Sequence, residues 1–361
     1  MNDRQATHGS PATGVGRTPA RPGPGDTLNG SGQAARPRQR PGRAQPPDEA
    51  FAAAVLAGLG APRKSIPSTW LYDERGSQLF EAITDLPEYY PTRTEIGLLR
   101  DHGADIARHA GPDAVLIEIG SGSSRKTPLL LARMEHPFAY VPIDISRAFL
   151  LHSVALLRDQ FPHLHILPTV ADFTGPLQPP HAFHCAPARA RRVVFFPGST
   201  IGNLAPDEAV SCLTRLRELC GRRGLIVLGV DQNREETTLL PAYDDADGVT
   251  AQFDLNLLAR INRELDGTFD LDAFRHESRY DRQRHRIEMH LVSQREQSVR
   301  VLGHWFHFTA GETIHTENSY KFDRVDIEAM AARAGLQRID GWSDDDDRFA
   351  IHLLAPPEAV N

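Results

Sequence analysis

A glycine-rich segment, EIGSGSSRKT at residues 118–127, holds the first residues whose types and spacing suit the binding of a small molecule. It follows an apolar run and precedes a helical pattern, so backbone N–H groups and a helix N-terminus are expected to face a ligand. A P-loop needs a second glycine where Arg125 stands, and that side chain would obstruct the phosphate cradle. The dinucleotide fingerprint needs its third glycine at the same position, which leaves NAD only as an alternative.

Two acidic residues at the ends of successive predicted strands favour a ligand without phosphate. Asp144 closes the segment FAYVPID, at a separation from Gly120 that suits a ribose-binding acid. Asp172, in VADFTG, ends the next strand and is placed to face an adenine ring. S-adenosylmethionine (SAM) needs a small residue at the strand turn and an acid on its ribose, so the pattern predicts a SAM site. The alternative role for Asp144 is a cap on the following helix.

Short strands alternating with helices must position this loop and these acids. Strand patterns occupy residues 115–119, 139–143, 164–169, 193–196 and 225–230, and most are separated by helical patterns such as 206–219. This alternation predicts an α/β fold with a Rossmann-like, doubly wound, mostly parallel sheet. After Asp231 the pattern changes to a helix at 244–265 and antiparallel strands at 286–292 and 298–308. A helix at 325–334 and a strand at 349–354 are expected to return to the first sheet.

The layout predicts three parts. Residues 1–47 are rich in Pro, Gly and Arg and cannot bury enough apolar surface to fold, so a disordered tail is expected. Residues 95–231 plus 322–356 are expected to form the SAM-binding core. Residues 48–94 plus 232–321 are expected to form a smaller α+β lobe that binds the substrate.

The bulk composition limits the classes of protein. A net charge of −7 argues against a nucleic-acid binder. No apolar run approaches the roughly 18 residues of a membrane span, and no secretory signal is evident. Three cysteines are too few for a disulfide framework, and buried free thiols are predicted at Cys212 and Cys220. We expect a cytoplasmic monomer that acts on a small molecule, with no nucleic-acid or membrane partner.

Several segments resemble, in matching order, the histidine-specific, SAM-dependent Nα-methyltransferase family. They are YDERGSQLFEAITDLPEYYPTRTE, EIGSGSSRKT, FFPGSTIGNL, YDDADGVTAQFDLNLLARINRELD, RIEMHL and IHTENSYKF. The resemblance runs from about residue 50 to the C-terminus. That family trimethylates the α-amine of L-histidine to hercynine, the first step towards ergothioneine. The resemblance therefore implies SAM as the cofactor and L-histidine as the substrate.

The resemblance also implies roles for residues at matched positions. Cofactor contacts are implied for Gly120, Lys126, Asp144, Asp172, Phe173 and Gly198. Tyr89, Asn203 and Tyr243 are expected to hold the carboxylate and amine region of the substrate. Tyr72 and Phe80 line the same cavity, and Met289 packs near the imidazole ring. Glu317 and Ser319 match the pair that reads the ring, and the expected catalytic residues are Tyr72, Asn203 and Tyr243.

The chemistry of methyl transfer is consistent with these assignments. The cofactor brings the reactivity, so the protein mainly aligns the donor with a neutral amine. Three successive transfers end in a quaternary ammonium group, which the faces of Tyr72, Phe80 and Tyr89 would attract. Glu317 and Ser319 are two residues apart on an extended segment and point to the same side, where they can bind the two ring nitrogens.

Other chemistries are less well supported by the residues. Sixteen histidines show no metal-ligand spacing, so we expect no metal site, and the acidic run at 344–347 is expected to be a solvated turn. Two alternative functions remain open. One is an Nα-methyltransferase for another, aromatic amino acid. The other is a catalytically silent cofactor-binding module whose arginine-rich tail engages a partner.

Overall fold

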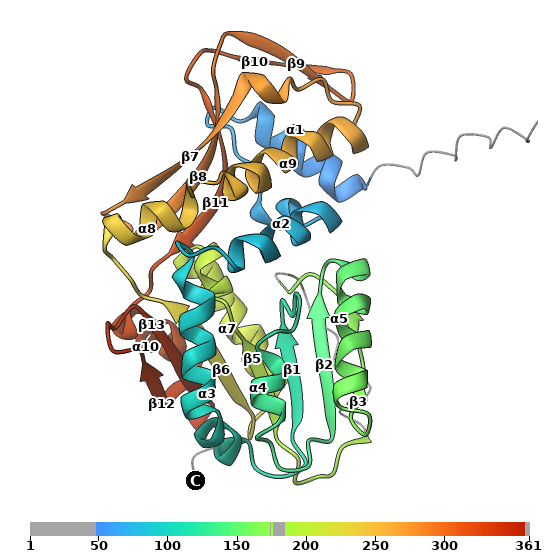
Figure 1. The fold of residues 1–361 in the computed structure, drawn as a ribbon, viewed down its shortest axis with the longest axis vertical. Coiled ribbons are helices and arrows are strands. Elements are labelled where there is room, and N and C mark those ends of the chain that lie inside the picture. The colour runs from blue at the N-terminus through green and yellow to red at the C-terminus, as the bar shows by residue number, and fades with distance from the viewer. Residues whose placement is uncertain (1–47, 174, 176–184, 358–361) are drawn as a thin grey trace, which may run out of the picture. The chain divides into compact units, whose positions relative to one another are not determined.

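The computed structural model describes residues 48–173, 175 and 185–357 (Figure 1). The predicted tail at 1–47 lies outside the described residues. The main sheet contains β1 (Val115–Ile119), β2 (Ala139–Asp144), β3 (His165–Ile166), β4 (Thr169–Val170), β5 (Arg192–Phe196), β6 (Leu225–Asp231), β12 (Gln337–Ser343) and β13 (Phe349–Ala355). Its order is β12-β13-β6-β5-β1-β2-β3, with β4 also paired to β2. The last two strands are antiparallel additions to a parallel sheet, which confirms the predicted Rossmann-like fold.

Helices cover both faces of this sheet. On one face lie α3 (Tyr90–Ala110), α4 (Thr127–Leu131) and α5 (Arg147–Gln160), and on the other lie α7 (Pro206–Cys220) and α10 (Arg324–Arg333). In β1, Leu116 packs with the first group, whereas Val115 and Ile117 pack with the second. Coverage on both sides explains why every residue of β1 is buried, including Glu118, rather than every second one.

A second set of elements surrounds a separate apolar core. It contains α1 (Glu49–Gly60), η1 (Ser68–Leu71), α2 (Glu74–Thr84), α8 (Glu236–Tyr243), α9 (Val249–Glu264), η3 (Leu271–Ala273), β7 (Phe274–Asp281), β8 (Arg286–Ser293), β9 (Gln297–Val301), β10 (His304–Phe308) and β11 (Thr313–Tyr320). Strands β11, β8 and β7 form an antiparallel sheet, and β9 pairs with β10. Helix α1 begins at Glu49 because the Asp48 side chain accepts hydrogen bonds from two backbone N–H groups of the first turn.

Two predicted elements in this region were wrong in detail. The helix expected from residue 244 begins only at Val249, because the Asp245 carboxylate accepts hydrogen bonds from the N–H groups of Val249 and Thr250. The strand expected at 298–308 is a hairpin, because the chain reverses at Leu302 and Gly303, which both have positive φ. The sequence patterns also missed β7 and β12.

Other predictions concern single features of the fold. The predicted strand at 164–169 is divided into β3 and β4, which both pair with β2. Cys212 and Cys220 are buried free thiols, as predicted, and burial raises their pKa values to about 11 and about 12. Among the described residues, no helix combines the length and apolar character of a membrane span.

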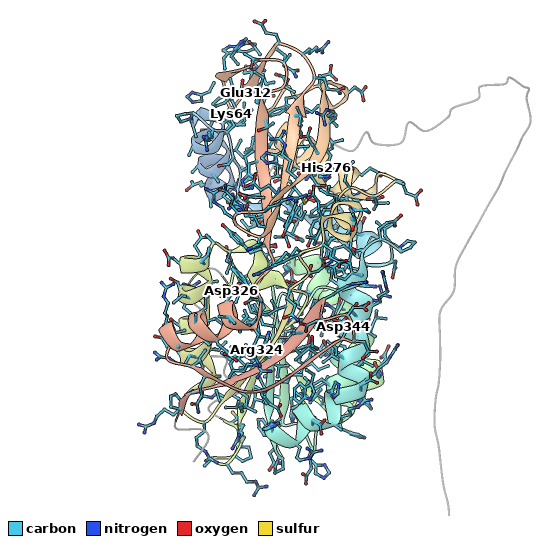
Figure 2. The ribbon with its side chains drawn as sticks, turned by 90° about the vertical axis from the view of Figure 1, so that its left-hand side faces the viewer. Lys64, His276, Glu312, Arg324, Asp326 and Asp344 are labelled. Carbon is cyan, nitrogen blue, oxygen red and sulfur yellow. The ribbon has the colours of Figure 1, made fainter. Side chains whose placement is uncertain are left out.

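The acidic run at 344–347 forms the turn between β12 and β13, as predicted. The Asp344 carboxylate, labelled in Figure 2, accepts hydrogen bonds from the N–H groups of Arg348 and Phe349 at 2.8 and 2.7 Å. A carboxylate that accepts backbone hydrogen bonds in this way closes a turn. These bonds account for the position of Asp344 without a bound cation.

Candidate active site

A cavity of about 200 Å³ opens at the carboxyl ends of β1, β2 and β5. All six predicted cofactor contacts line it: Gly120, Lys126, Asp144, Asp172, Phe173 and Gly198. Four predicted substrate contacts also line it: Tyr72, Phe80, Tyr89 and Asn203. The other four are not among its lining residues: Tyr243, Met289, Glu317 and Ser319. The structure connects this second group to the cavity through hydrogen bonds and packing.

The glycine loop has the backbone geometry that its sequence requires. Gly120 and Gly122 have positive φ values of 65° and 48°. A Cβ at Gly120 would meet no atom within 4 Å, so the loop leaves open space on its cavity side. The helix that follows the loop, α4, has only five residues. The helix expected after the loop is therefore short, and the loop residues 120–126 form this part of the cavity wall.

Asp144 fixes the loop to the end of β2. One carboxylate oxygen accepts a hydrogen bond from the N–H of Gly122 at 2.9 Å, and the other accepts from the N–H of Ser146 at 2.8 Å. Burial raises the pKa of Asp144, and these backbone bonds oppose that effect. Ser146 is the residue before α5, so Asp144 orders the entry to this helix while lining the cavity, and neither of these two bonds reaches an N–H of the first helical turn.

Lys126 is held by an acid that was not predicted as a site residue. Its Nζ lies 2.6 Å from Oε2 of Glu95, a wholly buried carboxylate on α3. The same oxygen accepts a hydrogen bond from the N–H of Gly198 at 2.8 Å. Glu95 therefore joins two predicted cofactor contacts from different strands. Nothing in its helical sequence pattern distinguishes it from a surface acid.

Replacing Gly229 with alanine is expected to destabilise the protein by about 1–3 kcal/mol, as overpacking does. A Cβ at Gly229 would lie only 1.9 Å from Oε1 of Glu95. The carboxylate cannot move away without releasing Lys126 and Gly198. The control is Gly97→Ala in α3, where a Cβ meets nothing within 4 Å and should be neutral or slightly stabilising. Thermal melts of both variants test this, and equal melting temperatures would contradict it.

A second buried acid lies beneath the glycine loop. Glu118 lines the cavity and accepts hydrogen bonds from the hydroxyls of Thr127 and Tyr140. Burial raises its pKa to about 7, against the opposing effect of these hydroxyls. Glu118 was not predicted as a site residue, although it stands in the quoted loop segment.

Aromatic rings form a continuous wall from η1 to α8. The ring centroids of Tyr72 and Phe80 are 5.5 Å apart, those of Phe80 and Tyr89 are 6.3 Å apart, and those of Tyr89 and Tyr243 are 6.1 Å apart. All three pairs meet edge to face, a favourable arrangement for aromatic rings. Phe253, which the sequence analysis missed, supports Tyr72 from α9 at 5.4 Å. The predicted aromatic residues therefore share one surface.

Glu317 joins residues from three separate segments. Its Oε1 accepts hydrogen bonds from Asn203 Nδ2 at 3.0 Å and from the Tyr72 hydroxyl at 3.2 Å. Met289 lies directly opposite Glu317 in the β8–β11 pairing. Burial raises the pKa of Glu317 to about 8, and the Tyr72 hydrogen bond partly opposes this shift. The structure thus brings together four residues that the family resemblance selected.

The raised pKa of Glu317 predicts a pH-dependent stability. The folded protein holds this proton more tightly than the unfolded chain, so the associated stability is lost as pH rises from about 4.5 to about 8. Glu317→Gln is therefore expected to melt several degrees above the unsubstituted protein at pH 9, with a smaller difference at pH 5. Thermal melts of the ligand-free proteins measure it. A variant that is less stable at pH 9 would contradict the assignment.

Ser319 and Tyr243 form one polar cluster with residues that were not predicted. The two hydroxyl oxygens are 2.8 Å apart. Lys321 donates to both, and it also pairs with Asp231 at 2.6 Å. The Tyr90 hydroxyl donates to the same Asp231 carboxylate. Because side chains alternate along a strand, the spacing 317, 319, 321 is the signal that could have identified Lys321.

His276 fixes the backbone at Tyr243. Its ring lies 2.7 Å from the Asp254 carboxylate and 2.9 Å from the carbonyl oxygen of Tyr243, and Figure 2 labels it on β7. Burial lowers the pKa of His276, but the Asp254 hydrogen bond and charge outweigh burial, and the net pKa is raised. This hydrogen-bonded pair supports α8 and the tyrosine at its end.

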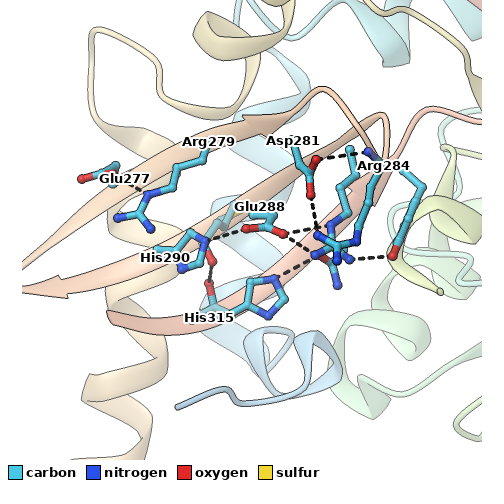
Figure 3. A network of polar contacts seen from close by, with 12 residues as sticks. Glu277, Arg279, Asp281, Arg284, Glu288, His290 and His315 are labelled. Atoms are coloured by element: carbon cyan, nitrogen blue, oxygen red, sulfur yellow. Dashed lines mark hydrogen bonds and ion pairs between the residues drawn. The ribbon is translucent and has the colours of Figure 1, made fainter. Parts of the chain in front are cut away.

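The opposite face of the same antiparallel sheet carries a different set of groups (Figure 3). There Glu288 contacts Arg286 and His290, and His315 contacts Asn318. Alternation separates Glu288 and His290 from Met289, and the β-bulge between His315 and Glu317 places these two residues of β11 opposite His290 and Met289 respectively. No group of three or more His, Cys, Asp or Glu side chains with metal-binding geometry occurs within 48–173, 175 and 185–357.

Comparisons with known proteins match most of the chain. A family model described as SAM-dependent, histidine-specific methyltransferase matches residues 51–356. The chain is 42% identical over 311 residues to histidine N-alpha-methyltransferase of Mycolicibacterium smegmatis, covering 84% of this chain and 94% of that protein. It is 40% identical over 306 residues to the protein of the same name from Mycobacterium tuberculosis, covering 83% and 93%. It is also 29% identical over 301 residues to ergothioneine biosynthesis protein 1 of Neurospora crassa, covering 81% of this chain and 33% of that protein.

Proposed function

Because the chain belongs to the family of SAM-dependent, histidine-specific methyltransferases, we propose that its cavity aligns SAM with the α-nitrogen of L-histidine and that the enzyme trimethylates this nitrogen. The observation that carries the assignment is the position of Glu317. This buried carboxylate is hydrogen-bonded to two residues that line the cavity, Tyr72 and Asn203. It is therefore placed to accept a hydrogen bond from a polar ring that is bound next to the glycine loop.

The residues around the loop fit SAM. The space beside Gly120 admits a ligand close to the backbone, and Lys126 provides a cation for a carboxylate. Asp144 is assigned to the ribose hydroxyls, Asp172 and Phe173 to the adenine, and Gly198 to the backbone wall beside the ligand. When bound, SAM supplies an electrophilic methyl group on a sulfonium.

The substrate is assigned to the aromatic side of the cavity. Asn203, Tyr89 and Tyr243 would hold its carboxylate and amine region, and Glu317 and Ser319 would bind the two ring nitrogens. Met289, opposite Glu317 in the sheet, would pack against the ring. Placement of this kind can lower the activation free energy of the reaction by about 7–11 kcal/mol.

The tyrosines in this site act as hydrogen-bond donors. Burial raises the pKa values of Tyr72, Tyr89 and Tyr243 well above the usual tyrosine value. These phenols therefore stay protonated at neutral pH and do not serve as bases. An α-amine with a pKa of about 8 supplies its own neutral fraction, so the three proposed catalytic residues, Tyr72, Asn203 and Tyr243, orient the amine. The ring faces of Tyr72 and Phe80 suit the growing ammonium group.

A single incubation tests the proposed function. The protein is mixed with L-histidine and SAM carrying a deuterated methyl group, and the products are read by mass spectrometry. Mono-, di- and trimethylated histidine with the label on the α-nitrogen are expected. A mixture of free amino acids serves as the competitor set. Methylation of a different amino acid, or no labelled amino acid at all, would contradict the proposal.

Further assignments extend this proposal. Similarity to the Neurospora crassa protein supports a place in ergothioneine biosynthesis. We assign residues 95–231 plus 322–356 to the methyltransferase core, and residues 48–94 plus 232–321 to the substrate-binding lobe. The net charge of −7 supports the proposed absence of a nucleic-acid partner. We also propose a cytoplasmic monomer, and light scattering in solution tests the monomer.

A further inference from the structure

Lys321 lies at the wall of the proposed substrate site, and its side chain is fully buried. It follows β11, two residues after Ser319 and four after Glu317, so all three side chains point to one side. Its Nζ lies 2.6 Å from Asp231 Oδ2, 2.8 Å from the Tyr243 hydroxyl and 2.9 Å from Ser319 Oγ. An ammonium group has three N–H donors, and these three contacts use all of them.

Asp231 fixes the position of this ammonium group. Asp231 is also fully buried and balances its charge. The same carboxylate accepts hydrogen bonds from the Tyr90 hydroxyl and from the N–H of Asn233. The ammonium group is therefore locked to the main sheet, whereas Tyr243 and Ser319 come from the other set of elements.

The donors and acceptors of the cluster can be counted. An ammonium group has no lone pair, so neither hydroxyl can direct its hydrogen at Lys321. The hydroxyls of Tyr243 and Ser319 are 2.8 Å apart, and one hydrogen fills that contact. The second hydroxyl hydrogen has no acceptor among the described residues. It is left to point at a bound ligand.

We infer that Lys321 is a positioning residue that makes the Tyr243–Ser319 pair a hydrogen-bond donor to the substrate ring, and so selects the neutral imidazole. The inference rests on the proposed function. A neutral imidazole has one N–H and one acceptor nitrogen. Glu317 accepts from the N–H, and the serine hydroxyl donates to the other nitrogen. When the Tyr243 hydroxyl donates to Ser319, both lone pairs of Ser319 Oγ accept hydrogen bonds, one from Tyr243 and one from Lys321. The second N–H of an imidazolium would then find no acceptor there and would lie close to a buried cation.

The ionisation of the bound ring tests the inference without any substitution. Histidine labelled with ¹⁵N at both ring positions is bound together with S-adenosylhomocysteine, and its ring shifts are recorded from pH 8 down to about pH 6, near the free imidazole pKa. One protonated and one unprotonated, hydrogen-bonded nitrogen are expected throughout. Two protonated ring nitrogens in the complex would overturn the inference.

Substitution separates positioning from a merely structural role. Asp231→Asn/Lys321→Met removes the buried pair without leaving one charge uncompensated. We expect the KM for histidine to rise at least tenfold while kcat and the affinity for S-adenosylhomocysteine change less than twofold. In a Ser319→Ala background the same double change should have little further effect on KM. An unchanged KM, or an equal rise in both backgrounds, would overturn the inference.

The matched control is Lys64→Met. Lys64 is another largely buried lysine paired with a carboxylate, Glu312, and Figure 2 labels both residues. Lys64 does not line the cavity, so the KM and kcat of the Lys64→Met variant for histidine should stay within twofold of those of the unsubstituted protein. If the unsubstituted protein does not methylate histidine, the proposed function itself fails. If it does, and the Lys321 variant has the same KM, only the present inference fails.

Discussion

At pH 9, where a carboxyl with a pKa of about 8 is ionised, Glu317→Ala is expected to lower kcat/KM for L-histidine by about 10- to 200-fold, because a hydrogen bond to a charged group contributes about 1.5–3 kcal/mol. The carboxylate also orients Asn203 and Tyr72, whose side chains donate to Oε1. Removing it leaves the ring N–H and two cavity-lining donors without their acceptor. The affinity for S-adenosylhomocysteine should change less than twofold, because no described cofactor contact bonds to Glu317. Steady-state kinetics and calorimetry measure the two quantities.

The control for this variant is Glu296→Ala. The Glu296 side chain is 77% exposed and pairs only loosely with His307 at 3.6 Å. Its histidine kinetics should match those of the unsubstituted protein. If Glu317→Ala left histidine turnover intact, or abolished cofactor binding instead, Glu317 would not be the residue that reads the ring.

Gly120→Val should abolish detectable binding of S-adenosylhomocysteine, a loss of at least about 100-fold. The branched side chain would fill the open space at the carboxyl end of β1, on the wall assigned to the cofactor. It would also strain a backbone whose φ is 65°. Calorimetric titration of the folded variant measures the loss.

Strain alone must be separated from occlusion of the cavity. Gly303→Val provides the comparison, because Gly303 has a φ of 82°, lies in the β9–β10 turn and does not line the cavity. Both variants should lose a similar amount of stability, but only Gly120→Val should lose the ligand. Normal affinity in Gly120→Val would place the cofactor elsewhere.

The main sheet could be predicted from sequence because its strands are buried on both faces. Strand β1 is apolar at every position except Glu118, and α7 begins with a proline in its first turn. The antiparallel elements were harder to predict. The Asp245 carboxylate delays α9, and β7, with the sequence FRHESRYD, is half-exposed and charged, so it lacks a clean alternation. Side-chain hydrogen bonds and surface charge therefore decided the elements that periodicity missed.

The site shows a similar division. Residues within recognisable segments, such as Asp144 and Glu317, could be selected from the sequence, and the structure places them around one cavity or bonded to its wall. Glu95, Asp231 and Lys321 were missed. Each is a buried charge whose partner lies far away in the chain, and a single sequence shows the charge but not the partner.

The measurement that most directly tests the central claim is a crystal structure of the protein with S-adenosylhomocysteine and L-histidine. The cofactor is expected on the glycine loop, with the α-nitrogen of histidine facing its sulfur. The imidazole is expected within about 2.7–3.2 Å of both the Glu317 carboxylate and the Ser319 hydroxyl. A histidine ring bound away from Glu317, or an α-nitrogen turned from the sulfur, would contradict it.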